Sequence, residues 1–258
     1  MKTGPLVDAK EMPLGTKPAQ KFWERYFAVY DTLNESIPYR RMIERHVELL
    51  NPGAGDFALD AGTGTGNVAL ALLRRGVRIL GVDFCQPALE ICRRKVPGGE
   101  FLYADLSKPL EFLSNCFDSV ACCCVLHVLD ERSQRCAVRE LFRVLKPGGS
   151  IVISSFVSGF DPLRVYWETL RERRKISKLG ETLWFGLSHG WATLRIFYYV
   201  AQIQRGNKHG EHNFLRQDVL AAMLEQSGFL VKSVEPIFAS QCVLALARKP
   251  ADQSFSLQ

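Results

Sequence analysis

Three acidic residues in the first half of the chain each follow a short apolar stretch: Asp60, Asp83 and Asp105. The first of them opens a segment with glycine at alternate positions, Asp60–Gly66 (DAGTGTG). A carboxylate can accept both hydroxyl hydrogens of a ribose diol, and glycine suits positions where a ligand approaches the backbone closely. These residue types at these spacings therefore predict a site for a nucleotide-like ligand.

The glycine segment lies between an apolar run that starts at Phe57 and a helical pattern that starts at Asn67. This order predicts a buried strand, a tight turn and the start of a helix. A helix that begins at the turn points its unpaired N–H groups and the positive end of its dipole at a ligand, so the turn suits an anionic group. The alternative is a glycine-rich connection without a ligand.

Two kinds of ligand compete for this segment. A dinucleotide fingerprint has the form G-x-G-x-x-G, with an acidic residue about 20 positions further on. Asp83 lies 21 positions beyond Gly62, but Gly66 comes one residue too early and Asn67 stands where the fingerprint has Gly or Ala. The glycine spacing therefore argues against NAD.

Three segments resemble known methyltransferase motifs. Asp60–Gly66 is similar, position for position, to the first motif of the class I S-adenosylmethionine-dependent methyltransferases, an acidic residue followed by G-x-G-x-G. Arg143–Gly149 (RVLKPGG) resembles the turn before the fifth strand in that superfamily. Tyr30–Asn34 (YDTLN) resembles the Y-D-x-x-N of ubiquinone/menaquinone-type methyltransferases. The resemblance implies that the cofactor is S-adenosyl-L-methionine.

The resemblance also implies which residues hold the cofactor. The glycine segment would hold the methionine end, the second acidic position the ribose and the third the adenine, while a tyrosine upstream would close over the methionine. The implied contacts are Tyr30, Asp60, Gly62, Thr63, Gly64, Gly66, Asp83, Phe84, Asp105 and Leu106.

The order of apolar and amphipathic segments predicts a Rossmann-like, doubly wound α/β fold. Strand-like segments alternate with helical ones as far as Phe156, which favours a parallel sheet. Two final strands, about 230–238 and 241–248, are too close together for a crossover connection, so the last strand is antiparallel. We expect a seven-stranded sheet, mostly parallel with an antiparallel last strand. A dinucleotide dehydrogenase would need a second domain, for which no residues remain.

The chain divides into four segments. Residues 1–50 hold a mobile tail and helices that cap the core, and residues 51–156 form the cofactor-binding core. Residues 157–213 interrupt the strand–helix alternation with a basic and aromatic helical insertion, which we expect to act as a lid. Residues 214–258 add a helix and the antiparallel strand pair that complete the core.

His127 is the candidate general base, because it follows the fourth strand at the rim where open α/β sheets bind ligands. The alternative is that His127 only lines the cofactor pocket or packs under it. His209 and His212 suit an exposed loop, and the eight cysteines show no metal-ligand spacing. Adjacent cysteines at 122–124 would point to opposite faces of a strand, so we expect no metal.

The insertion indicates the class of acceptor. Its aromatic residues Trp184, Trp191 and Tyr198 recur at a spacing that keeps them near one helical face, and a basic patch precedes them. We expect the aromatic face to cover a pocket for a small-molecule or lipid-like acceptor, such as a quinone or another apolar aromatic compound. The alternative is an aromatic stripe that packs on the core. The basic patch would guide an acidic substrate or an anionic membrane surface, and it consists of Arg171, Arg173, Arg174, Lys175 and Lys178.

The expected function is S-adenosylmethionine-dependent methyl transfer by a cytoplasmic enzyme, with contact to the inner face of a membrane as an open alternative. The oligomeric state is left open. A different class of function would be an S-adenosylmethionine-binding protein that is non-catalytic or that transfers another group. An NAD-binding oxidoreductase and a nucleic-acid methyltransferase rank behind both. Nucleic acid is not expected as a partner, because no RNA-binding module accompanies the positive charge.

Overall fold

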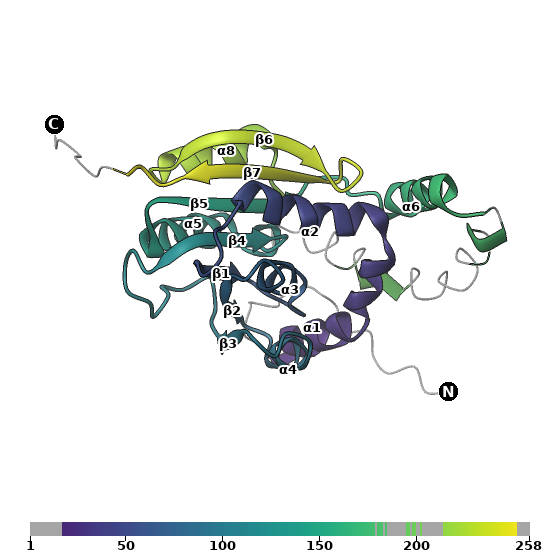
Figure 1. Cartoon of the computed structure of the whole chain (residues 1–258), viewed down its shortest axis with the longest axis horizontal. Coiled ribbons are helices and arrows are strands. Elements are labelled where there is room, and N and C mark those ends of the chain that lie inside the picture. Colours follow the sequence, from purple (N-terminus) through teal and green to yellow (C-terminus); the bar gives the residue numbers. More distant parts are fainter. Residues whose placement is uncertain are drawn as a thin grey trace.

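The computed structural model describes residues 17–178, 180–182, 184, 195–196, 198–199, 202 and 214–251. A seven-stranded sheet runs through this part of the chain in the order β3-β2-β1-β4-β5-β7-β6 (Figure 1). β7 pairs antiparallel with both of its neighbours, and the other adjacent pairs are parallel, which confirms the predicted fold. The strands are β1 (Phe57–Ala61), β2 (Arg78–Asp83), β3 (Glu100–Tyr103), β4 (Phe117–Cys123), β5 (Leu145–Phe156), β6 (Leu230–Ile237) and β7 (Cys242–Arg248).

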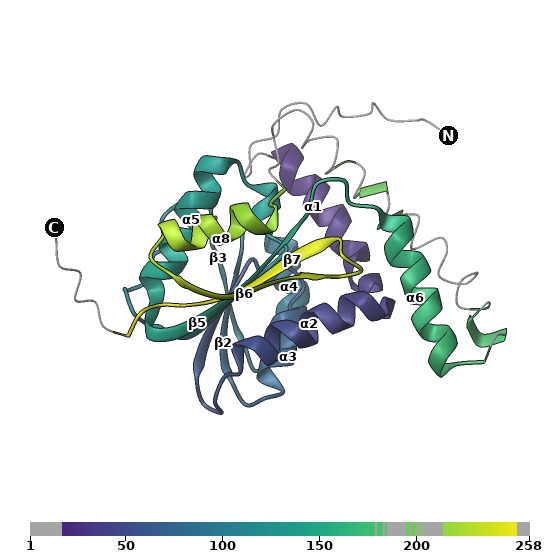
Figure 2. The ribbon, with the colours of Figure 1, turned by 90° about the horizontal axis from the view of Figure 1, so that it is seen from above.

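Helices cover both faces of the sheet (Figure 2). Ile43, Leu72 and Leu89 pack against one face, and Leu141 and Leu224 pack against the other. The first group comes from α2, α3 and α4, and the second from α5 and α8. The described helices are α1 (Lys17–Tyr30), α2 (Ile37–Leu50), α3 (Asn67–Leu73), α4 (Gln86–Lys95), α5 (Glu131–Val144), α6 (Pro162–Ile176), α8 (Gln217–Gln226) and the 3-10 helices η1 (Asp31–Glu35) and η2 (Leu126–Val128).

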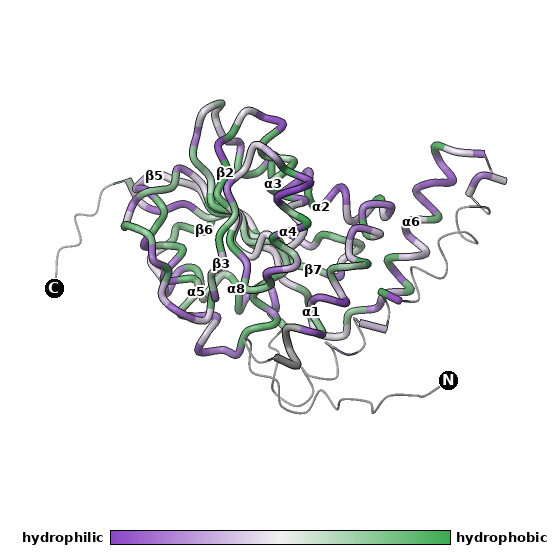
Figure 3. Tube along the Cα trace, turned by 90° about the horizontal axis from the view of Figure 1, so that it is seen from below, coloured by the Kyte–Doolittle hydropathy of each residue, from purple (hydrophilic) through white to green (hydrophobic). Residues whose placement is uncertain are grey.

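The central strands are buried on both faces, which explains their nearly continuous apolar sequence. In β4 the side chains of Val120, Ala121 and Cys122 are fully buried. Figure 3 shows the same property as a hydrophobic centre of the tube, with hydrophilic residues concentrated on the surrounding helices and loops. The sheet therefore supplies a rigid base on which the loops at the carboxyl ends of its strands are placed.

α2 begins earlier than the sequence predicts. The sequence predicts that Pro38 interrupts the chain before a helix that starts near Tyr39, whereas Pro38 lies in the first turn of α2. Proline fits there because the first turn of a helix leaves its N–H groups unpaired. η1 connects α1 to α2, and α1 lies beside α4 (Figure 1).

β5 also begins earlier than predicted. The sequence predicts a fifth strand from Ser150, whereas β5 begins at Leu145. Leu145 pairs with Phe117, and the register then shifts before Ser150 pairs with Ser119. The predicted turn is therefore an irregularity within a longer strand.

α6 projects beyond α2 (Figure 2), and ion pairs hold it to the rest of the molecule. Glu172 is buried, and its carboxylate accepts hydrogen bonds from Arg41 at 2.6 Å and Lys175 at 2.5 Å. Arg173 Nη2 lies 3.0 Å from Glu35 Oε2. Two members of the predicted basic patch, Arg173 and Lys175, therefore form internal ion pairs.

The predicted lid, residues 157–213, is described over 157–178 and at few positions beyond, and residues 185–194 and 203–213 lie outside the described residues. Trp191 of the predicted aromatic stripe lies there as well. Trp184 is 68% exposed and Tyr198 is 54% exposed, so these two residues do not pack on the core. Within the described part of the chain, we find no helix that is long and apolar enough to cross a membrane.

Gly66, at the N-cap of α3, sets how closely α3 approaches α4. A Cβ atom at Gly66, where φ is +81°, would lie 2.4 Å from Cys92 Sγ, whereas Gly55, with φ of +86°, has no atom within 4 Å of its Cβ position. We expect Gly55→Ala to lower the free energy of unfolding by about 1–2 kcal/mol through backbone strain. Gly66→Ala adds a steric overlap and should cost about 1–3 kcal/mol more. Urea unfolding measures both, and equal losses would contradict this account.

Candidate active site

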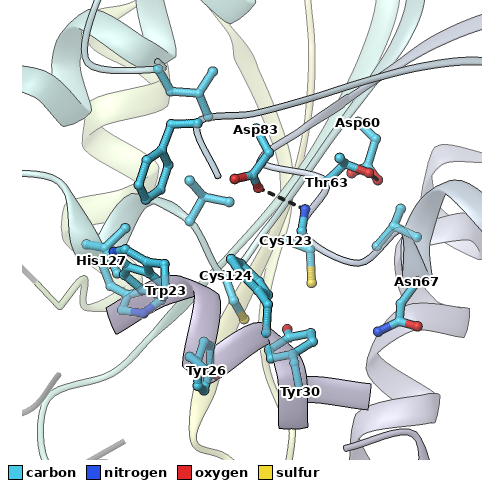
Figure 4. A pocket seen from close by; sticks show the side chains of 18 of the residues that line it. Trp23, Tyr26, Tyr30, Asp60, Thr63, Asn67, Asp83, Cys123, Cys124 and His127 are labelled. Atoms are coloured by element: carbon cyan, nitrogen blue, oxygen red, sulfur yellow. Dashed lines mark hydrogen bonds between the residues drawn. The ribbon is translucent and has the colours of Figure 1, made fainter. Parts of the chain in front are cut away.

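A pocket lies at the carboxyl ends of β1, β2 and β4, and α1 forms its opposite wall (Figure 4). The space between its lining atoms, open solvent included, amounts to about 900 Å³. Every site residue predicted from the sequence lines this pocket except Gly66, whose surroundings are Cys92 and Val96 of α4.

Asp60, near the end of β1, braces the glycine turn. Its Oδ2 accepts hydrogen bonds from Thr63 Oγ1 at 2.7 Å and from the Ala69 backbone N–H at 3.2 Å. The carboxylate thus ties the strand to both the turn and the first residues of α3. Burial raises the pKa of Asp60 to about 6, although the two hydrogen bonds act in the opposite direction.

Asp83, the last residue of β2, holds the same turn from the neighbouring strand. Its Oδ2 accepts the Gly64 N–H at 2.9 Å (Figure 4), and its Oδ1 accepts the Cys85 N–H at 2.9 Å. Burial raises the pKa of Asp83 to about 6 as well. Each carboxylate oxygen can accept a second hydrogen bond, so Asp83 keeps capacity for the hydroxyl groups of a ligand.

The glycine turn presents bare backbone to the pocket. A Cβ atom at Gly62 would lie 2.2 Å from Val125 Cγ2, and one at Gly64 would lie 3.1 Å from Phe27 Cε1. Both glycines also have positive φ. Because side chains at these positions would fill the cradle, glycine is required here on steric and conformational grounds.

Asp105 and Leu106 line the pocket beyond β3. Asp105 Oδ1 accepts hydrogen bonds from the Ser107 N–H at 2.9 Å and the Ser107 hydroxyl at 2.6 Å, which fix the turn. Lys108 Nζ lies 3.5 Å from Asp105 Oδ2. The carboxylate is therefore held in place with one oxygen engaged by the turn and the other beside an exposed lysine.

The opposite wall is aromatic, and sequence reasoning missed most of it. Trp23, Tyr26, Phe27 and Tyr30 of α1 line the pocket, and the Trp23 ring meets Phe84 edge-on at 6.0 Å between centroids. The residues recur every three or four positions, so they share one helical face. The sequence shows this stripe, but it does not show that the stripe faces a ligand site.

His127 lies in η2, directly after β4, and it lines the pocket as predicted. The imidazole is buried, stacks on Phe214 at 5.6 Å and meets Phe156 edge-on at 4.7 Å. The two phenylalanine rings fix the plane of the imidazole. His127 thus lines the pocket and packs against aromatic rings, as the alternative reading has it, and its role as a general base stays a prediction.

The sequence predicts that the adjacent residues Cys123 and Cys124 point to opposite faces of a strand, and this prediction is wrong. Cys124 follows the last residue of β4 and adopts a φ of +54°. Both Sγ atoms therefore lie near Ser154 Oγ, at 3.6 Å for Cys123 and 3.5 Å for Cys124. Both residues line the pocket, yet no group of His, Cys, Asp or Glu among the described residues is arranged to hold a metal ion.

The chemistry of this pocket fits S-adenosylmethionine. Two buried carboxylates suit its ribose hydroxyl groups and its ammonium group, and the bare backbone of the glycine turn admits its methionine end. Leu106 suits the adenine, and the aromatic wall gives the methyl group apolar surroundings.

Comparisons with known proteins agree with this assignment. Residues 59–153 match the family model for the methyltransferase domain. A demethylmenaquinone methyltransferase of Thermotoga maritima is 29% identical over 87% of this chain and 93% of its own length. The ubiquinone/menaquinone biosynthesis C-methyltransferase UbiE of Geobacter sulfurreducens is 34% identical over 49% of this chain and 53% of its own.

Among solved structures, the N-methyltransferase NodS of Bradyrhizobium japonicum, in complex with S-adenosyl-L-homocysteine, has a similar fold. Its TM-score is 0.63 at 17% identity, and the match covers 90% of this chain and 98% of that one. Fold, glycine turn, family model and relatives lead to one conclusion. The chain is a class I S-adenosylmethionine-dependent methyltransferase that resembles the ubiquinone/menaquinone biosynthesis methyltransferases.

Proposed function

We propose that this enzyme methylates a ring carbon of a reduced quinone or a closely related hydroxylated aromatic compound. The observation that carries the proposal is the aromatic wall of α1, where Trp23, Tyr26 and Phe27 face the acidic strand ends across the pocket. Planar aromatic acceptors pack well against such rings. The names of the relatives from Thermotoga maritima and Geobacter sulfurreducens support a quinone-type acceptor.

In this proposal the cofactor lies against the strand ends. Asp83, with Phe84 beside it, binds the ribose hydroxyl groups, and Asp105 with Leu106 contacts the adenine. The Gly62–Gly64 backbone and Thr63 hold the methionine end, with Asp60 bracing them. Burial raises the pKa of Tyr30 well above its usual range, so its hydroxyl stays protonated and can donate a hydrogen bond at the methionine end.

S-adenosylmethionine supplies an activated methyl group, because its sulfonium is a good leaving group. The protein then has to align the acceptor carbon, exclude water and handle protons. His127 takes the proton of an acceptor hydroxyl, which increases the electron density on the neighbouring ring carbon. That carbon would take the methyl group as the methyl–sulfur bond breaks and the sulfur leaves as a neutral thioether. The same carbon would then lose its hydrogen as a proton to water, which restores the aromatic ring. The hydroxyl recovers a proton from His127 or water.

A second proposal concerns the outward face of α6. Leu163 and Trp167 are 55% and 64% exposed, and Arg171 and Arg174 continue the same face at helical spacing. Figure 3 shows hydrophobic and hydrophilic residues close together along α6. Aromatic and basic residues on one exposed face suit an anionic membrane, where a lipid-like acceptor would dissolve. We propose that α6 contacts such a membrane.

The buried carboxylates predict how cofactor affinity depends on pH. Binding requires ionised Asp83 and Asp60, so the affinity for S-adenosylhomocysteine should be constant above pH 7 and fall as the pH drops through about 6. Each carboxyl contributes up to about tenfold per pH unit. Asp83→Ala should raise the Kd at neutral pH at least about tenfold, through the loss of charge-assisted hydrogen bonds, and should make the pH dependence less steep. Calorimetry at several pH values measures both effects.

Asp218→Asn on α8 is the matched control, because it removes an exposed carboxylate that does not line the pocket. It should bind like the wild type. A folded Asp83→Ala variant with wild-type affinity would remove Asp83 from the cofactor site.

Incubation with S-adenosylmethionine carrying a ¹³C-methyl group tests the acceptor. We expect methylation of a reduced 1,4-naphthoquinone with a free ring position and no methylation of the oxidised form, whose ring carbon is electrophilic. Mass spectrometry detects the product, and the ¹³C shift distinguishes a C-methyl from an O-methyl group. Methylation of the hydroxyl alone, or turnover only of unrelated amines, would contradict the proposal.

His127→Asn should lower kcat by about 10²–10⁴-fold with this acceptor, the usual contribution of a general base. Its Kd for S-adenosylhomocysteine should stay near that of the wild type, which separates a proton-transfer role from cofactor binding. Unchanged turnover across the pH range would show that alignment alone carries the reaction.

Vesicle sedimentation tests the membrane proposal. The wild type should co-sediment with vesicles containing anionic lipid at low salt and much less at high salt or with neutral vesicles, because electrostatic attraction is screened. Arg171→Gln/Arg174→Gln should weaken sedimentation. Arg132→Gln/Arg139→Gln on α5 is the matched control, because it removes the same charge from exposed positions elsewhere. It should not weaken sedimentation. Equal effects of the two double variants would mean that membrane binding depends on net charge and not on α6.

A further inference from the structure

Asp31, the first residue of η1, joins the cap helices to the cofactor core from outside the pocket lining. Its Oδ1 accepts hydrogen bonds from Thr65 Oγ1 at 2.7 Å and from Lys95 Nζ at 2.8 Å. The amides of Asn34 and Asn67 lie at 3.4 Å from the same oxygen. One carboxylate oxygen therefore meets groups from the glycine turn, α3 and α4.

Asn67 extends this network to the pocket. Its Oδ1 accepts a hydrogen bond from Lys95 and another from Asn34 at 3.2 Å. Its Nδ2 donates to Tyr39 Oη at 3.0 Å, and the Tyr39 hydroxyl donates to Tyr30 Oη at 3.2 Å. Asn67, Tyr39 and Tyr30 line the pocket. A continuous set of hydrogen bonds thus runs from a lysine outside the pocket to a hydroxyl within it.

The position of Asp31 in the chain shows which element this network holds in place. Asp31 directly follows the last residue of α1, the helix that carries the aromatic wall. Among the described residues, Lys95–Asp31 is the ion pair that joins this connection to α4, and Lys95 is mostly buried, with its side chain 20% exposed. Partial burial reduces screening of the pair by solvent. Breaking this contact would free the end of α1 without removing any group from the pocket.

We propose that Asp31 and Lys95 form a latch that holds α1 closed over the cofactor and positions Tyr30. Asp31 is a positioning residue, because it acts through Thr65, Asn67 and α1 and does not line the pocket. The inference rests on the cofactor occupying this pocket, as proposed above. It goes beyond that proposal by naming what keeps the cap in place.

Binding kinetics test the latch. In Asp31→Ala, S-adenosylhomocysteine should dissociate about tenfold faster in surface plasmon resonance, with a smaller change in its association rate, because a loosened α1 releases the ligand more readily. Asp31→Asn and Lys95→Met should each speed dissociation about threefold, and the double variant should be no worse than either, since both remove one shared interaction. Additive effects of the two changes would overturn the pairing.

Hydrogen exchange without ligand supplies a readout that does not depend on the cofactor site. Amides of α1 should exchange faster in Asp31→Asn than in the wild type, while those of α8 should not change. Glu24→Ala is the matched control, since it removes an exposed carboxylate from α1 itself, and it should leave dissociation and exchange as they are. Equally increased exchange in α1 and α8, with unchanged dissociation, would show a general loss of stability and overturn the latch.

Different results would contradict the proposed cofactor site and the proposed latch. If wild-type protein does not bind S-adenosylhomocysteine, the proposed cofactor site is wrong, whatever α1 does. If the wild type binds the ligand but Asp31→Asn and Lys95→Met leave both dissociation and α1 exchange unchanged, the site stands and the latch is wrong.

Discussion

Two buried carboxylates hold the turn on which this active site depends. Asp60 binds Thr63 and the start of α3, and Asp83 binds the Gly64 N–H, so the turn is fixed from two neighbouring strands. Burial raises the pKa of both groups to about 6, above the value of about 3.9 for an unfolded Asp. The stability that their protonated forms contribute is complete below about pH 3.9 and is lost as the pH rises through about 6. The fold therefore keeps two ionised groups at neutral pH at a cost in stability, which is expected of groups that serve a ligand.

The N-terminal helix α1 supplies apolar surface that the strand ends of the sheet lack. Strand ends offer carboxylates and bare backbone, which bind a polar cofactor, but they offer little apolar surface for an acceptor. α1 provides that surface with Trp23, Tyr26 and Phe27, and η1 ties α1 to the glycine turn through Asp31. Under the latch proposal, these contacts behind the pocket link cofactor binding to closure of the aromatic wall.

The parts of the structure that follow from local pattern could be predicted from the sequence. The mostly parallel sheet with its antiparallel last strand follows from strand–helix alternation and one short hairpin, and Asp60, Asp83 and Asp105 lie together because parallel strands end on the same edge. The role of α1 could not be predicted, because a stripe of aromatics looks the same whether it packs on a core or faces a ligand. Neither could the position of Cys124, since a positive φ at a residue other than glycine leaves no local signal. Gly66 does not line the pocket, and a Cβ atom there would meet Cys92 and Val96, so its contact with the cofactor stays a prediction.

A crystal structure of the complex with S-adenosylhomocysteine tests the central claim most directly. The account predicts the ribose hydroxyl groups within hydrogen-bond distance of Asp83, the adenine beside Asp105 and Leu106, and the sulfur directed toward the aromatic wall of α1. A ligand bound elsewhere, or one in this pocket whose ribose does not contact Asp83, would contradict the assignment of the site.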